Sequence, residues 1–84
     1  MIFTAEIKVM PLKELLDPQG KAVLSGLGNL NIKSVTDVRI GKHIQLQIEA
    51  NTKEDASSVA EDAAKKLLAN PVMEDYTIQI MQSL

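Results

Sequence analysis

Few residues in this chain could do acid–base, nucleophilic or metal chemistry. His43 is the single histidine among 84 residues, and the sequence has no cysteine. This excludes metal sites built on histidine pairs or thiolates, together with thiol catalysis and disulfides. Spacing alone leaves a serine–histidine–acid triad open, but Ser57 and Ser58 fit ordinary surface positions of a predicted helix. We therefore expect no catalytic residue, no cofactor-binding residue and no metal ligand in this chain.

The carboxylates have structural explanations. They lie near predicted helix starts or on a polar helix face, where capping and solubility account for them: Asp17, Glu54, Asp55, Glu61 and Asp62. The run Gly26-Leu27-Gly28 falls late in a predicted helix. A nucleotide-binding fingerprint needs its glycines between a strand and a helix, so this run indicates a cap or close packing instead.

Arg39, Lys42 and His43 form a small basic group in the middle of the sequence. Its simplest explanation is a solvated bend, and its functional alternative is contact with a carboxylate on a partner protein. Nucleic acid is a poor candidate partner, because the net charge is −2 and the pI is about 5.2. An RNA-binding sheet would also need exposed aromatic residues, whereas Phe3 and Tyr76 are both in phase with apolar core positions.

Five predicted elements must position these residues, beginning with a half-buried strand over residues 2–10. Its apolar residues alternate with polar ones and share one face: Phe3, Ala5, Ile7 and Val9. Met10-Pro11 ends the strand, because proline cannot donate to a ladder. Residues 11–16 then form a connector, and the last strand of the chain runs over residues 76–80.

Capping signals predict two helices. Asp17 is a good N-cap with Pro18 at the first helical position, and Asn31 can close this helix in the left-handed conformation. Thr52 caps the second helix, and Asn70-Pro71 ends it. Two ion pairs are spaced i,i+4 along the second helix: Glu61 with Lys65, and Asp62 with Lys66.

Residues 35–49 carry an unusual alternation that keeps one phase. The apolar residues share even numbers: Val38, Ile40, Ile44, Leu46 and Ile48. A tight hairpin at Gly41-Lys42 would pair Ile40 with His43 and turn the later apolar set to the wrong face. A long strand bent near Gly41 keeps the phase and is favoured, and a bulged hairpin stays as the alternative. The two halves of one long strand would belong to two different sheets, and the second sheet would come from another copy of the chain.

The order of elements predicts an α+β fold, a ferredoxin-like two-layer sandwich. We expect strand, helix, long bent strand, helix and strand, with two helices on one face of an antiparallel sheet. The alternative is a βαββαβ order with the long strand split at Gly41. No apolar run approaches the roughly 20 residues of a membrane span, and no signal peptide is visible. A chain of 84 residues is only marginally stable alone, which also favours an oligomer.

Three runs resemble the PurS family, the small subunit of phosphoribosylformylglycinamidine (FGAM) synthase. They are Asp17-Pro18-Gln19-Gly20-Lys21-Ala22-Val23, Val38-Arg39-Ile40-Gly41-Lys42, and Lys66-Leu67-Leu68-Ala69-Asn70-Pro71-Val72-Met73-Glu74-Asp75-Tyr76. Their order and spacing fit a single PurS-like domain over residues 1–84. Two departures stand out: Asn31 where the family has glycine, and Gly26 where alanine is common.

The resemblance implies a non-catalytic subunit in de novo purine biosynthesis. In that family a large synthetase subunit uses ATP and magnesium to activate formylglycinamide ribonucleotide, and a glutaminase subunit releases ammonia. PurS-like subunits are homodimers or higher homo-oligomers that bridge the two in the cytoplasm, without nucleic acid or membrane. The polar members of the matching runs, and neighbours of these runs, are the expected partner contacts: Lys13, Asp17, Gln19, Lys21, Arg39, Lys42 and His43.

Two other functions compete with this interpretation. A small dimeric ligand-sensing module of ferredoxin-like fold would be stabilised by its effector through mass action. A stand-alone phosphatase would need a cationic phosphate cradle and a positioned nucleophile, yet Arg39 is the single arginine. The sequence therefore favours the bridging subunit.

Overall fold

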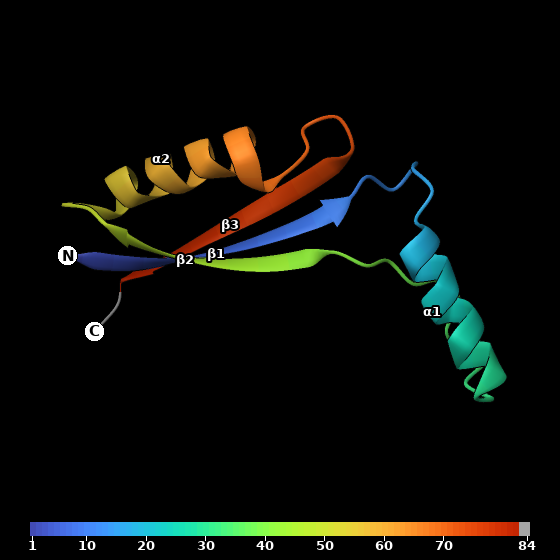
Figure 1. Cartoon of the computed structure of the whole chain (residues 1–84). Coiled ribbons are helices and arrows are strands. Elements are labelled where there is room, and N and C mark those ends of the chain that lie inside the picture. Colours follow the sequence, from blue (N-terminus) through green and yellow to red (C-terminus); the bar gives the residue numbers. More distant parts are fainter. Residues whose placement is uncertain (83–84) are drawn as a thin grey trace.

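The computed structural model describes residues 1–82 of the chain. In order, its elements are β1 (Ile2–Pro11), α1 (Pro18–Asn29), β2 (Lys42–Glu49), α2 (Lys53–Ala63), the π-helical turn η1 (Ala64–Leu68) and β3 (Glu74–Gln82). The strands form one antiparallel sheet in the order β2-β1-β3, so β1 is central (Figure 1). The predicted α+β class and the order of strands and helices are confirmed.

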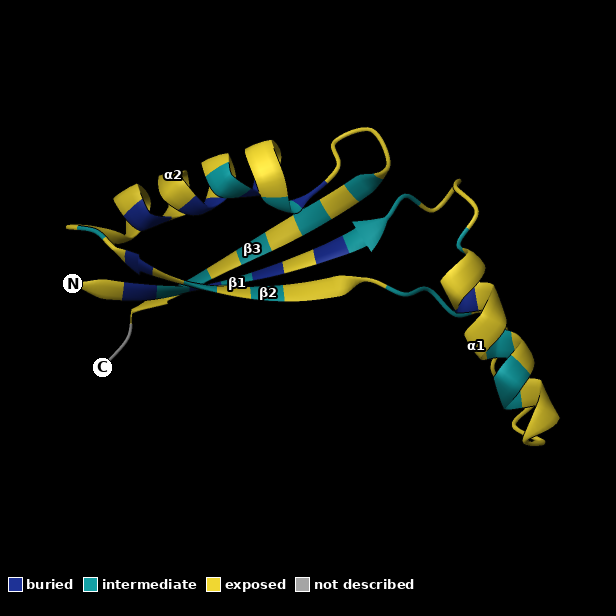
Figure 2. Cartoon of the chain, viewed as in Figure 1, coloured by how far each residue is buried: buried dark blue, intermediate teal, exposed yellow. Residues whose placement is uncertain are grey.

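The central strand supplies most of the core. Phe3, Ala5, Ile7 and Val9 are all buried, as their alternation predicts, and Figure 2 shows them as dark bands along β1. Ile7 lies opposite Ile44 of β2 on one side and Ile78 of β3 on the other. Since paired residues share a face, one side of the sheet is apolar across all three strands.

Helix α2 covers this apolar face. Ala56, Ala60 and Ala64 are fully buried and recur every four residues, so a line of small side chains faces the sheet. The Thr52 hydroxyl accepts a hydrogen bond from the Asp55 amide at 3.1 Å, which confirms the predicted cap. Both predicted ion pairs also form on the outer side of the helix: Glu61–Lys65 at 4.0 Å and Asp62–Lys66 at 3.2 Å.

The predicted place of the first helix is wrong. Its start at Pro18 and the left-handed Asn31 (φ 65°) are as expected, but α1 lies beyond the end of the sheet (Figure 1). Within residues 1–82, α2 packs against all three strands, and α1 has no comparable packing against the sheet. The physical reason is an anchor at the helix base: the Asp17 carboxylate binds the amide of Ile40, just before β2 begins. This contact holds α1 at the end of the strands rather than on their face.

The predicted strand over residues 35–49 is also too long. Only Lys42–Glu49 pairs with β1, and residues 35–41 are neither helix nor strand. No hairpin forms at Gly41 either, because the chain runs on from β2 toward α1 (Figure 1). Pairing with β2 stops where Val9 meets Lys42, whereas Met10 and Pro11 of β1 still pair with β3.

The result is an extended molecule with principal extents of 51 × 30 × 14 Å. We call residues 12–40, which hold the connector, α1 and the returning segment, the arm. The arm projects from the end of the sheet that lies farthest from the N-terminus (Figure 1). Most of its residues are exposed and yellow in Figure 2, and most of the others are intermediate and teal.

Candidate partner-binding site

Asp17 fastens the arm to the sheet. One carboxylate oxygen accepts a hydrogen bond from the Gly20 amide at 2.9 Å, which caps α1. The other oxygen accepts from the Ile40 amide at 2.8 Å. Both oxygens are therefore used within the chain, and the side chain joins the start of α1 to Ile40, the last residue of the arm. The predicted N-cap is confirmed, and the role in closing the arm is one that sequence reasoning missed.

These hydrogen bonds favour the ionised carboxylate. The amide of Gly20 is the main cause, followed by the amide of Ile40, and together they hold the pKa of Asp17 below its usual value. Glu6 on β1 behaves in the same way. Its pKa is lowered first by the hydrogen bond from Gln45 at 2.7 Å and then by contact with His43.

We expect the protein to lose stability on acidification because of these two carboxyls. A carboxyl whose pKa is lower in the folded state adds stability that is complete above its unfolded-state pKa. That stability is lost as the pH falls through the folded-state pKa. Thermal unfolding at pH 7, 5, 4 and 3 should therefore show the midpoint falling by several degrees below about pH 4.

The control for this prediction is the double variant Asp17→Asn with Glu6→Gln, which removes both titrating groups. It should unfold at a lower temperature at pH 7 and show a flatter dependence on pH. An acid decline as steep as that of the unmodified chain would assign the effect to other carboxyls.

Two more contacts close the base of the arm. The Arg39 guanidinium donates a hydrogen bond to the carbonyl oxygen of Pro11, which ties the returning segment to the end of β1. Gly20 is the one buried residue of α1, and its Cα faces the carbonyl oxygen of Val38 so closely that a Cβ would overlap it. The helix and the returning segment thus touch backbone to backbone.

An open groove of about 430 Å³ lies between the connector, α1 and the returning segment. It brings together four of the predicted contact residues: Lys13, Asp17, Lys21 and Arg39. Glu14 and Asp37 also line it, as do leucines of the connector and helix. Three cations, three carboxylates and several leucines suit a protein surface of mixed character rather than a phosphate group.

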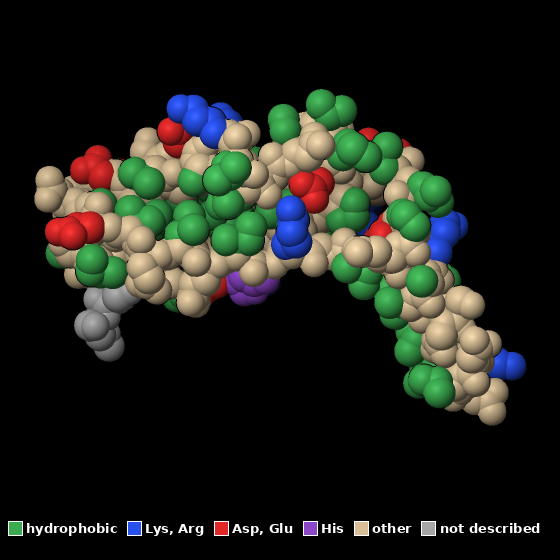
Figure 3. All heavy atoms as spheres, viewed as in Figure 1, with side chains coloured by type: hydrophobic (Ala, Val, Ile, Leu, Met, Phe, Trp, Pro, Cys, Tyr) green, Lys and Arg blue, Asp and Glu red, His purple; other side chains and the backbone are tan. Residues whose placement is uncertain are grey.

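The other three predicted contacts lie elsewhere, so the basic group is not a single patch. Gln19 is exposed and does not line the groove. Lys42 points to the helix face, where its Nζ is 3.8 Å from Glu74 and 3.5 Å from the carbonyl of Leu68. His43 occupies the opposite face, 2.5 Å from Glu6, and is the purple side chain beneath the sheet in Figure 3. Since neighbouring residues of a strand point to opposite faces, His43 points away from Ile44.

A second, apolar hollow of about 260 Å³ adjoins the groove and was missed at the sequence level. Pro11, Leu15 and Leu16 line one side, and Asn70, Met73 and Glu74 line the other. Leu16 is 73% exposed and Met73 is 52% exposed. The sequence does carry a signal for this hollow, because apolar residues surround the turn at Pro71. A turn with a purely structural role would not need them, so they indicate a surface for contact.

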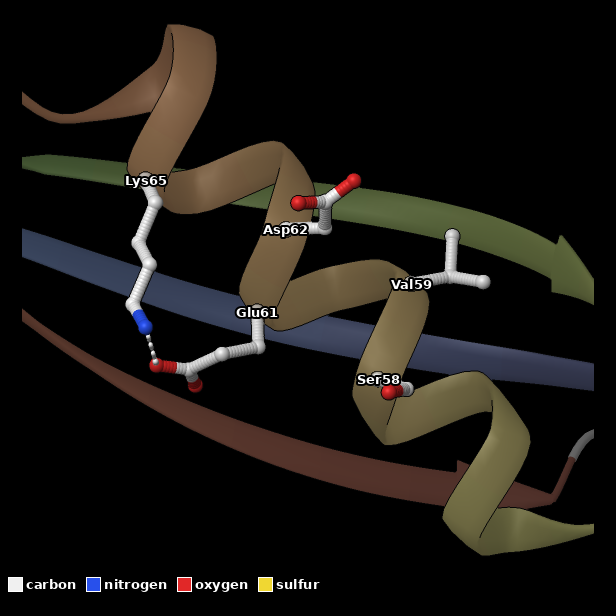
Figure 4. A pocket seen from close by; sticks show the side chains of 5 residues that line it. All are labelled: Ser58, Val59, Glu61, Asp62 and Lys65. Atoms are coloured by element: carbon white, nitrogen blue, oxygen red, sulfur yellow. Dashed lines mark ion pairs between the residues drawn. The ribbon is translucent and has the colours of Figure 1, made fainter.

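The outer surface of α2 offers no chemistry. The five residues that line a shallow hollow there are Ser58, Val59, Glu61, Asp62 and Lys65, and the Lys65 ammonium points toward the Glu61 carboxylate (Figure 4). Neither Ser57 nor Ser58 is hydrogen-bonded to His43, which lies on the far face of the sheet. Within residues 1–82, no three His, Cys, Asp or Glu side chains gather as metal ligands would.

Comparisons with known proteins give one consistent result. The family model described as PurS, phosphoribosylformylglycinamidine (FGAM) synthase, matches residues 4–82. The chain is 37% identical over 79 residues to the synthase subunit PurS of Bacillus subtilis (strain 168), covering 94% of this chain and 93% of the relative. The Mycobacterium leprae (strain TN) subunit PurS is 45% identical over 74 residues, with 88% and 90% covered.

Solved structures agree with the sequence comparisons. A chain in the structure of PurLQS from Thermotoga maritima superposes with a TM-score of 0.89 at 32% identity, covering 96% of this chain and 99% of that chain. The B. subtilis PurS C2 crystal form gives a TM-score of 0.86 at 36% identity, with 95% and 99% covered.

Proposed function

This chain belongs to the PurS family, the small subunits of FGAM synthase, and we propose that it holds the synthetase and glutaminase subunits together for ammonia transfer. Membership makes the chain a subunit of an enzyme of purine biosynthesis. The proposal concerns its role within that complex. Ammonia made by one subunit would be used by the other before it diffuses away or is protonated, which is catalysis by proximity.

The observation that carries the proposal is the match to a chain of PurLQS over 96% of this chain. That structure is named for three components, and this chain resembles one of them along nearly its whole length. The mixed groove at the base of the arm supports a contact surface, because it gathers charged and apolar side chains without a catalytic arrangement. ATP and magnesium would belong to the synthetase subunit, which activates formylglycinamide ribonucleotide.

We assign partner contact first to Lys13, Lys21 and Arg39, which line the groove, and then to Gln19, Lys42 and His43, which are exposed. Asp17 acts through the shape of the arm, since both its oxygens are occupied within the chain. We also propose a cytoplasmic location, because the chain is a subunit of an enzyme of purine biosynthesis. No helix within residues 1–82 is long and apolar enough to cross a membrane.

The test is reconstitution of the synthetase and glutaminase with and without this chain, with glutamine or ammonia as nitrogen source. Omitting the chain should lower glutamine-supported synthesis on the order of tenfold or more and leave ammonia-supported synthesis unchanged. Equal glutamine-supported rates with and without the chain would refute the bridging role.

Charge reversal should locate the surface. The double variant Lys13→Glu with Lys21→Glu should weaken assembly and raise the chain concentration needed for half-maximal glutamine-supported activity roughly tenfold or more, since charges that oppose a partner cost several kcal/mol. Lys65→Glu with Lys66→Glu makes the same change on the outer side of α2 and should have little effect. A larger loss of glutamine-supported activity in the second double variant would indicate that the partner binds α2 instead of the groove.

A further inference from the structure

Strand β3 is an edge of the sheet that lacks the usual protection against pairing with another strand. Its inner side is bonded to β1, and no strand within residues 1–82 lies on its outer side (Figure 1). Natural edge strands are usually very short, or they carry lysine, proline or a bulge that blocks a further strand. β3 has nine residues, and from Tyr76 to Gln82 it contains no charged residue, proline or glycine.

The register identifies the backbone groups of β3 that are free. In an antiparallel ladder, residue pairs that exchange two hydrogen bonds alternate with pairs that exchange none. The Leu12 amide donates to the Met73 carbonyl at 2.9 Å, so this pair is bonded, and it continues the register of Pro11 opposite Glu74. The Glu74 amide agrees with the alternation, because it donates to the Asn70 carbonyl in the preceding turn at 2.8 Å. The next residues whose N–H and C=O groups point outward are therefore Tyr76, Ile78 and Ile80.

These three residues form a free edge beside a hollow. Within residues 1–82, no hydrogen bond uses their outward backbone groups. Their side chains are half-buried and lie on the sheet face that α2 covers. An open hollow of about 550 Å³ adjoins them, and three residues of α2 and three of β3 line it: Lys53, Glu54, Ser57, Ile78, Gln79 and Ile80. A strand added to β3 would extend the apolar face and place its own side chains in this hollow.

The charge at the start of β3 indicates what kind of strand fits there. The Glu74 carboxylate is already used, since it lies 3.8 Å from the Lys42 ammonium and accepts from the Asn70 amide at 2.7 Å. Asp75 is exposed and has no ion pair within residues 1–82. Because β3 contains no lysine or arginine, a second copy of β3 would leave Asp75 unmatched. A strand with a basic residue at this position would match it.

We propose that β3 accepts a strand from a partner subunit, with apolar side chains toward α2 and a lysine or arginine beside Asp75. Backbone hydrogen bonds give such strand addition its affinity, and alternate side chains give it selectivity. The assignment to a subunit of the complex rests on the bridging role proposed above. A chain that bridges two subunits needs two surfaces, and β3 supplies one apart from the groove. It ends where Gln82 pairs with Phe3, at the end of β1 opposite the arm.

Amide hydrogen exchange tests the proposal on the unmodified chain. The chain alone and the chain reconstituted with synthetase and glutaminase are exposed to deuterium, and exchange is then measured at each residue. The outward amides of Tyr76, Ile78 and Ile80 should exchange rapidly in the chain alone and roughly tenfold or more slowly in the complex. The amides of Thr77 and Gln79, which are bonded to β1, should be protected in both. Equally fast exchange of the outward amides in the complex would overturn the proposal.

The same experiment separates strand addition from the bridging role. A chain that enters the complex without protection of β3 would refute strand addition and leave the bridging role standing. Protection of β3, together with glutamine-supported synthesis that does not need the chain, would refute the bridging role and leave strand addition standing. Protection that appears in the chain alone and grows with its concentration would assign the edge to a second copy and overturn the proposal.

Two pairs of variants give a second test, in which affinity for the reconstituted synthetase and glutaminase is measured. Ile80→Pro removes an outward amide but no bond to β1, as an edge strand tolerates, and Ile80→Ala shortens the side chain but keeps the amide. The proline variant should bind roughly tenfold more weakly than the alanine variant. Asp75→Lys should likewise bind more weakly than Asp62→Lys, which makes the same change on the outer side of α2. Equal affinities within either pair would overturn the proposal.

Discussion

Replacing Gly41 with valine should lower the free energy of unfolding by about 3 kcal/mol, at the upper end of the cost of overpacking. A Cβ at this position would overlap the carbonyl oxygen of Val9 and the sulfur of Met10, and would lie 3.4 Å from the Met10 Cα. The methionine side chain can move. Val9 lies on the central strand and pairs with Lys42 on one side and Tyr76 on the other. Its carbonyl group can therefore move only if the sheet distorts.

Urea unfolding monitored by circular dichroism measures this change, and Gly41→Ala should give a smaller loss in the same direction. The unmodified chain and both variants should be compared at equal concentration, since the apparent stability of any associating protein depends on its concentration. An unchanged midpoint for Gly41→Val would mean that the fold does not need the close approach of Gly41 to β1.

Replacing Gly20 with alanine should have the second largest effect, because it separates α1 from the returning segment. The added methyl would overlap the carbonyl oxygen of Val38 and lie 2.7 Å from the Asp17 carboxylate. Either the helix moves outward or Asp17 gives up one of its two hydrogen bonds. We expect a loss of roughly 2 kcal/mol, and exchange of the α1 amides with deuterium should become faster than exchange in β1.

Gly26→Ala is the matched control, since it makes the same chemical change in the same helix. Apart from the nearby backbone of α1 itself and the two chain neighbours, no atom lies within 4 Å of a Cβ at position 26. Only helix propensity therefore changes, in favour of alanine by up to about 1 kcal/mol. The two variants should therefore shift stability in opposite directions. A loss of stability in both would show that the arm packs differently from this structure.

The local structure could be predicted because its causes are local. The alternation in β1, the caps at Asp17 and Thr52, and the left-handed Asn31 each depend on residues within a few positions of one another. Some of the candidate contact residues could be grouped correctly for the same reason. Lys13, Asp17 and Lys21 surround one helix start, so they had to lie near each other.

The failures concern contacts between distant parts of the chain. Apolar spacing predicts that α1 has a face to bury, but it does not identify the surface that buries it. The deciding contact joins Asp17 to the amide of Ile40, and no side-chain pattern marks a backbone donor. The meeting of Glu6 with His43 and Gln45 likewise depends on the register of β1 against β2, which alternation alone leaves open.

The double contact of Asp17 also bears on how the family can vary in length. Because one carboxylate binds both the start of α1 and the residue before β2, the arm is a closed loop whose base is fixed. Residues at its tip, from Leu30 to Ser34, are exposed, and the tip lies at the end of the arm away from the sheet (Figure 1). Evolution can thus lengthen or shorten the tip without moving the sheet, and insertions among relatives should concentrate there rather than between Pro11 and Asp17.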